Sequence, residues 1–278
     1  GVVMVGVNTI SINEGHLETL YDELSYAISH TSKGEMKEWG KGSAKLFIHL
    51  TIRRGRGLLK GMGTLLKFST YETISFVDAV IKKNTMDHLS NRTDSAYKSI
   101  KDKSHKLYQT LKIIALSIRS NPKEAAPQIL LGFIGFLIGS GGLDGDGGIP
   151  DKDLAFGIGN HRSIWTHSIL PALAIETIAF SLVTLVNTVH SKLPEKHDRF
   201  WDKLVENNKK LATAFVGGTC AGIAYHLLVD MNPTADRIKP YSDLPISTTM
   251  MGHKAIFGAN AAIEIIDLKE KGKYEHAT

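Results

Sequence analysis

The apolar residues of this chain recur at helical spacing along most of its length, and segments typical of β-strands are scarce. Residues 14–119 follow the helical pattern, and Asn121-Pro122 marks its first clear stop. Further helices are expected over about 164–190, 196–210, 211–230 and 253–270. The sequence therefore predicts an all-α fold, a helical bundle without a sheet.

A run of glycine and aspartate over residues 139–150 interrupts this pattern. So glycine-rich a stretch cannot form a regular helix, and long loops in compact domains often carry function. We expect this Gly/Asp-rich loop to lead directly into a metal site.

The character of the chain changes near residue 126. Residues 1–126 carry 19 Lys and Arg against 12 Asp and Glu, whereas residues 127–278 carry 14 against 16. We expect a helical, basic N-terminal region of undefined role and a helical domain over 127–278. The basic region suits an anionic partner, such as a membrane surface or nucleic acid, but a solvated helical surface explains the same charge equally well.

Membrane association is a second open question. Residues 129–138, 169–189 and 211–229 are strongly apolar, but the first stretch is shorter than the about 20 residues that a span needs. Buried core helices explain all three stretches equally well. No signal peptide is seen, since no basic region precedes the apolar start of the chain. We expect a cytoplasmic or inner-membrane-associated protein.

Three short fragments in the second half offer imidazole and carboxylate groups, the ligands that zinc-type divalent metals favour. One is an Asp-Lys-Asp turn, one holds two histidines six residues apart, and one places a histidine and an aspartate at i and i+4 on a helix. The candidate metal ligands are Asp151, Asp153, His161, His167, His226 and Asp230. Each fragment alone fits a structural role, but three within 80 residues beside apolar segments favour a shared site.

The order of these fragments, Asp151-Lys-Asp153, then His161-Arg-x-x-x-Thr-His167-Ser, then His226-x-x-x-Asp230, resembles the LexA-binding, inner-membrane-associated family of metal-dependent hydrolases. The resemblance covers about residues 127–260. This chain departs from the family pattern by one extra residue between Arg162 and Thr166, and residues 1–126 have no counterpart in it. The family in turn is similar to zinc-dependent phospholipases C and single-strand nucleases, which implies a helical protein with clustered zinc ions.

Together these observations predict a hydrolase that acts on an anionic phosphoester, such as a phospholipid or another phosphodiester, with water activated by one zinc ion or by two or more. Arg162 and Asp153 are the candidate catalytic residues; Arg162 could hold a phosphate oxygen or simply pair with Asp151 or Asp153. Arg237 and Lys239 are candidates for binding the substrate's charge. Two alternatives stay open at this point, a non-enzymatic membrane or regulatory module with a structural metal, and a metal-dependent nuclease.

Overall fold

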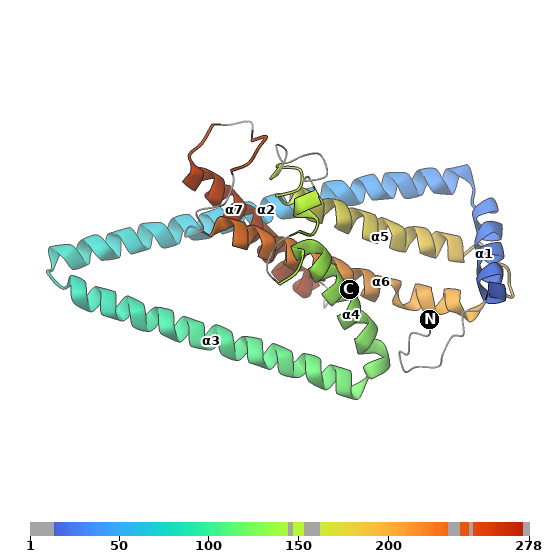
Figure 1. Ribbon diagram of the computed structural model, residues 1–278, viewed down its shortest axis with the longest axis horizontal. Coiled ribbons are helices and arrows are strands. Elements are labelled where there is room, and N and C mark those ends of the chain that lie inside the picture. The colour runs from blue at the N-terminus through green and yellow to red at the C-terminus, as the bar shows by residue number, and fades with distance from the viewer. Residues whose placement is uncertain (1–13, 144–146, 153–161, 233–239, 245–246, 275–278) are drawn as a thin grey trace. The chain divides into compact units, whose positions relative to one another are not determined.

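The computed structural model describes residues 14–143, 147–152, 162–232, 240–244 and 247–274 (Figure 1). Within these ranges the chain is helical and contains no strand, so the predicted all-α fold is confirmed. The helices are α1 (Glu14–Ser29), α2 (Lys33–Ile81), α3 (Thr85–Ser120), α4 (Pro122–Ser140), α5 (Leu170–His190), α6 (Arg199–Met231) and α7 (Met250–Tyr274).

The chain forms two compact units. One contains residues up to 57 together with residues from 127 onward, and the other is Leu58–Ala126. Residues 1–126 were expected to form a single region, whereas α1 and the part of α2 up to Gly57 fall in the unit that contains the C-terminal helices. The candidate site lies in this larger unit.

α6 is longer than the sequence pattern predicts. It runs without a break through residues 199–231, where two helices, about 196–210 and 211–230, were expected. The two expected helices meet at Lys209-Lys210-Leu211-Ala212, four residues of high helix propensity with no proline or glycine to end the helix.

The core of the larger unit is built on one face of α6. Val216, Cys220, Ile223 and Leu227 follow each other at helical spacing and are at most 1% exposed. They pack against buried side chains of α5 and α7, with Phe257 as the largest. Because burial of each such side chain contributes about 1.5–3 kcal/mol, this stripe fixes which face of α6 points inward.

α4 and α6 approach each other closely along glycines. A side chain added at Gly218 would overlap the backbone of Gly132, and one added at Gly222 would overlap the carbonyl oxygen of Phe136. On the α4 side, a side chain at Gly139 would overlap the carbonyl oxygen of Thr219. Only glycine lets the two backbones come this near.

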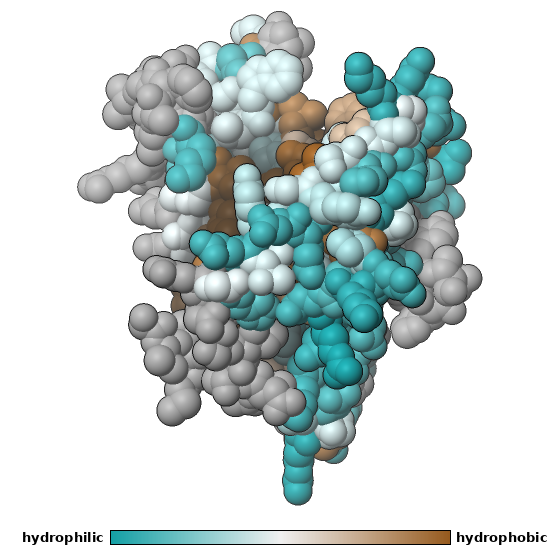
Figure 2. Space-filling view, turned by 90° about the vertical axis from the view of Figure 1, so that its right-hand side faces the viewer, coloured by the Kyte–Doolittle hydropathy of each residue, from teal (hydrophilic) through white to brown (hydrophobic). Residues whose placement is uncertain are grey.

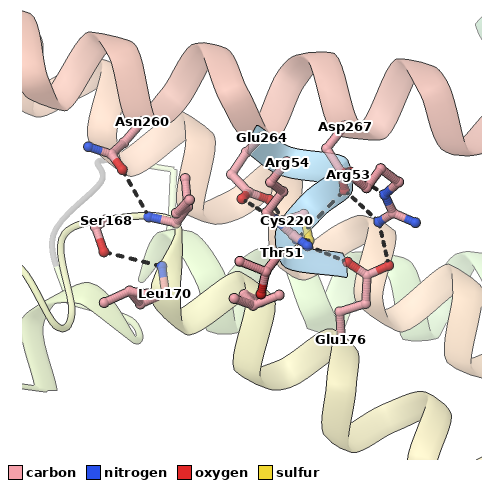
Figure 3. Close-up of polar contacts among 12 residues, drawn as sticks. Thr51, Arg53, Arg54, Ser168, Leu170, Glu176, Cys220, Asn260, Glu264 and Asp267 are labelled. Carbon is pink, nitrogen blue, oxygen red and sulfur yellow. Dashed lines mark hydrogen bonds and ion pairs between the residues drawn. The ribbon is translucent and has the colours of Figure 1, made fainter. Parts of the chain in front are cut away.

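Buried charges join α2, α5 and α7 (Figure 3). Arg54, whose side chain is fully buried, donates its Nε–H to Glu264 at 2.8 Å, and its Nη1 lies 2.9 Å from Glu176. Arg53 bonds Glu176 at 2.8 Å and Asp267 at 2.6 Å. Since buried charges are costly unless they are paired, these contacts fix the register of the three helices.

α5 and α6 are long and apolar enough to cross a membrane by length and composition, a test that core helices of soluble proteins also pass. Two hollows lie beside α5, a groove of about 820 Å³ against the start of α2 and an apolar pocket of about 320 Å³ against α1 and Trp201. Figure 2, which views the end of the molecule that carries α1, shows apolar surface in a recess bordered by hydrophilic residues.

Candidate metal centre

Four of the predicted ligands lie together, and they come from three separate segments of the chain. His226 and Asp230 share one face of the last turns of α6, both buried. His167, which is fully buried, lies shortly before α5, separated from it by Ser168 and Ile169. Asp151 stands in a short helical turn after the glycine-rich loop. The fold thus brings the three sequence fragments to one place.

The reactive atoms of these side chains converge. His167 Nε2 lies 3.3 Å from Asp151 Oδ1 and 3.7 Å from Asp230 Oδ2. His226 Nε2 lies 3.7 Å from Asp151 Oδ1 and 3.6 Å from Asp230 Oδ2. Ligands held about 2.0–2.1 Å from one ion lie about 3.3–3.4 Å apart at the tetrahedral angle. The observed spacings therefore suit a single zinc-sized ion with only small side-chain movements.

The other ring nitrogen of each histidine fixes its tautomer. His226 Nδ1 lies 3.3 Å from the carbonyl oxygen of Ser140, which can only accept, so Nδ1 carries a hydrogen. His167 Nδ1 lies 3.1 Å from the hydroxyl of Thr166, which donates to the carbonyl oxygen of Ser163 and so accepts from the ring. In the neutral state both Nε2 atoms then present lone pairs, and these face carboxylate oxygens.

The Asp230 carboxylate also presents an acceptor atom to this space. Its Oδ1 pairs with Arg162 at 2.8 Å, but its buried Oδ2 has no hydrogen-bond partner among the described residues. Acceptor atoms that converge in a buried space repel each other unless a cation or protons lie between them. The donor set therefore fits a divalent metal, with three mutually close ligands in Asp151, His167 and His226 and with Asp230 beside both histidines.

The two carboxylates differ in their electrostatic surroundings. Burial raises the pKa of Asp230 above its usual value, against the opposing charges of Arg162, His226 and His167. Burial also acts to raise the pKa of Asp151, but the contact of its carboxylate with the ring of His167 at 3.3 Å and the hydrogen bond from the Gly147 N–H outweigh it and lower that pKa. Asp151 is thus the better preformed anionic ligand of the two.

Arg162 enters the site on a constrained backbone. Its φ of 66° lies in the left-handed region that non-glycine residues seldom adopt. Its guanidinium pairs with Asp230 at 2.8 Å and stacks over the ring of Phe257. The sequence left two roles open for Arg162, and its contact with Asp230 shows a pairing with a carboxylate.

Three residues that the sequence analysis did not single out position the ligands. Tyr241, buried against Phe257, donates its hydroxyl to the carbonyl oxygen of His167 at 2.5 Å. Asp243 accepts from the Ile164 N–H at 2.7 Å and so holds the turn before His167. Ser140 provides the carbonyl for His226. Nothing local in the sequence marks these contacts, because each spans more than 70 residues.

Four residues of the predicted site lie outside the described residues. They are Asp153, predicted as a ligand and a catalytic residue, His161, predicted as a ligand, and Arg237 and Lys239, predicted to bind substrate. Their roles stay predictions.

In comparisons with known proteins, no family model, no curated protein and no solved structure matches the chain. The resemblance to inner-membrane-associated metal-dependent hydrolases therefore stays a prediction that rests on the motifs alone.

Proposed function

We propose that this protein is a metal-dependent hydrolase of a phosphoester, with its metal held by Asp151, His167 and His226. The observation that carries this proposal is the convergence of two imidazole lone pairs and two carboxylates in a buried space. Among the described residues three ligand groups lie mutually close, a count typical of catalytic zinc sites, and this favours an enzymatic over a structural role.

The residues around the ligands fit this chemistry. A divalent ion supplies an activated water and polarises a phosphoryl oxygen. The Asp230 carboxylate, adjacent to both histidines and with a raised pKa, is placed to accept a proton from such a water. Arg162 carries a planar fork that recognises phosphate as well as carboxylate, so it can exchange its contact with Asp230 for a substrate oxygen.

A substrate with an apolar part, such as a phospholipid, is favoured by the surroundings of the site. Trp165, two residues before His167, is 71% exposed, and Leu143 of the glycine-rich loop is 75% exposed. On α4 and α5, Phe133 and Ile178 are also more than half exposed. Exposed aromatic and aliphatic groups suit contact with a bilayer surface, and we propose peripheral association with the cytoplasmic face of a membrane.

The test combines metal content with hydrolysis. Elemental analysis of the purified protein is expected to find zinc or a similar ion, and activity is expected toward phospholipid vesicles or a soluble phosphodiester, with single-stranded DNA as the arm that detects a nuclease. His226→Ala should lower activity by on the order of 100-fold or more, because it removes a ligand. His105→Ala, which removes an exposed histidine far along the sequence, serves as the control.

Two outcomes contradict the proposal. Absence of bound metal, with no stabilisation by added zinc, would remove the site itself. The second outcome is a tightly bound metal without hydrolysis of any phosphoester. If His226→Ala and Arg162→Lys then cause only equal losses of stability, the metal site is structural. Arg162→Lys is informative because it keeps the charge and loses the fork, so it should reduce activity while metal content is preserved.

A further inference from the structure

A second group of potential ligands lies where α5 ends and α6 begins. His190 is the last residue of α5, His197 stands in the connection to α6, and Asp202 lies in the first turn of α6. His190 Nε2 is 2.9 Å and His197 Nε2 is 3.0 Å from the same oxygen of Asp202, Oδ1. The two imidazole rings meet edge to face at 5.2 Å.

The hydrogen bonds of His197 limit what can lie between its ring and Asp202. Its Nδ1 lies 2.8 Å from the carbonyl oxygen of Pro194, which can only accept, so Nδ1 carries a hydrogen. In the neutral ring Nε2 is then a lone pair that faces a carboxylate oxygen, and either a second proton or a metal ion has to lie between them. A histidine whose other nitrogen donates to a backbone carbonyl is the arrangement found at metal sites, because it orients the ring and increases its basicity.

The connection that carries His197 is held in place independently of the histidines. Glu23 of α1 accepts from the Asp198 N–H at 2.9 Å and from the indole of Trp201 at 2.8 Å. Asp198 in turn caps α6 by accepting from the Phe200 N–H at 2.7 Å. The ligands therefore need little ordering on binding, which favours affinity.

We infer that His190, His197 and Asp202 form a second divalent metal site, which links the end of α5 to the start of α6. Two imidazoles and one carboxylate select a borderline transition metal such as zinc, nickel or copper over magnesium and calcium, which prefer oxygen ligands. Ligands about 2.0–2.1 Å from an ion lie about 2.9 Å apart when they subtend 90°, so the two observed distances fit neighbouring ligand positions. Asp202 is 57% exposed, and water completes the coordination shell.

This inference does not depend on the proposed hydrolase, since the site shares no residue with the metal centre of Asp151, His167 and His226. Binding here is expected to stabilise the protein without being required for hydrolysis. Failure of one site therefore leaves the other untouched, and the two can be tested separately.

The experiment uses the full-length protein, stripped with a chelator and then titrated with zinc. The double variant His190→Gln, His197→Gln is expected to bind one ion per chain fewer than the wild type, and to lose the rise in Tm that the surface ion causes. His105→Gln, an exposed histidine outside the cluster, is the matched control and should bind as the wild type does. Substituted cobalt gives a second readout, because its visible spectrum reports imidazole coordination and should lose the contribution of this site in the double variant.

Asp202→Asn provides a second variant that keeps both histidines. It should weaken zinc binding at this site at least tenfold, while the far-ultraviolet circular dichroism and the Tm in chelator stay close to those of the wild type. The inference is overturned if the wild type and either variant bind the same number of zinc ions and are stabilised equally by them. The cluster is then a pair of protonated histidines hydrogen-bonded to a carboxylate.

Discussion

The close approach of α4 to α6 predicts that one methyl group at Gly222 weakens both the fold and the metal centre. In Gly222→Ala the added carbon would overlap the carbonyl oxygen of Phe136 and lie 2.8 Å from the Ser140 nitrogen and 3.0 Å from the Gly139 Cα. All three are backbone atoms, so no side chain can rotate away, and α4 has to move by on the order of 1 Å to restore contacts of about 3.5 Å.

The magnitude follows from two opposing effects of Gly222→Ala. Overpacking costs about 1–3 kcal/mol, and a backbone clash belongs at the upper end of that range. Alanine recovers just under about 1 kcal/mol through its helix propensity, which leaves a net loss of about 2 kcal/mol in the free energy of unfolding. For a chain of this size the Tm should fall by about 4–8 °C. Because Ser140 orients His226, zinc affinity should also fall, by about tenfold.

Gly217→Ala is the matched control on the same helix. A side chain at Gly217 meets nothing within 4 Å, so alanine there should raise the free energy of unfolding by about 0.5–1 kcal/mol. Thermal and urea unfolding followed by circular dichroism, in the presence of chelator, measure both variants, and competition with a zinc indicator measures affinity. If Gly222→Ala matches the wild type in stability and in zinc affinity, the proposed contact between the helices is wrong.

Two further predictions concern charged groups. Arg54→Met should lower the free energy of unfolding by about 3–5 kcal/mol, because it removes the buried positive charge that pairs with Glu264 and Glu176. The exposed Arg56→Met should stay within about 0.5 kcal/mol of the wild type in the same urea assay. A small loss for Arg54→Met would contradict the role of the buried network. The hydrogen bond with Lys192 is the main cause that lowers the pKa of Glu35 from its usual 4.5 to about 2, so the contribution of Glu35 to stability is complete above pH 4.5 and is lost as the pH falls toward 2. Glu35→Gln should flatten that part of the curve of Tm against pH. An unchanged curve would show that the pair contributes nothing to stability.

The parts of the fold that the sequence predicts well are those set by local patterns. The spacing of Val216, Cys220, Ile223 and Leu227 marks the inward face of α6, and the same periodicity places His226 one residue away from that stripe, beside the core. The i, i+4 placement of a histidine and an aspartate is equally local. The sequence predicted that the three fragments share one site. The ligands among the described residues, Asp151, His167, His226 and Asp230, do lie together.

The parts that the sequence did not predict depend on contacts between distant segments. No periodicity shows that Tyr241 donates to the backbone of His167, or that Arg53 and Arg54 enter the core to meet acids of α5 and α7. The approach of α4 to α6 did leave a signal, since both Gly135 and Gly139 and the pair Gly218 and Gly222 stand four residues apart. Such pairs become informative only when both helices are considered together.

The two candidate metal sites share one hydrogen-bond arrangement of a histidine but differ in burial. In each, a histidine donates from Nδ1 to a backbone carbonyl, Ser140 for His226 and Pro194 for His197, and presents Nε2 to a carboxylate. His226 is 2% exposed, so a proton placed there would itself be a buried charge, and a metal shared with a second imidazole satisfies more of the surrounding acceptors. His197 is 18% exposed, and the hydrogen bond with Asp202 already raises its pKa, so a proton can replace the metal there at little cost. Under the two proposals, burial makes the inner site depend on a bound ion, while the outer site can exchange an ion for a proton without losing its structure.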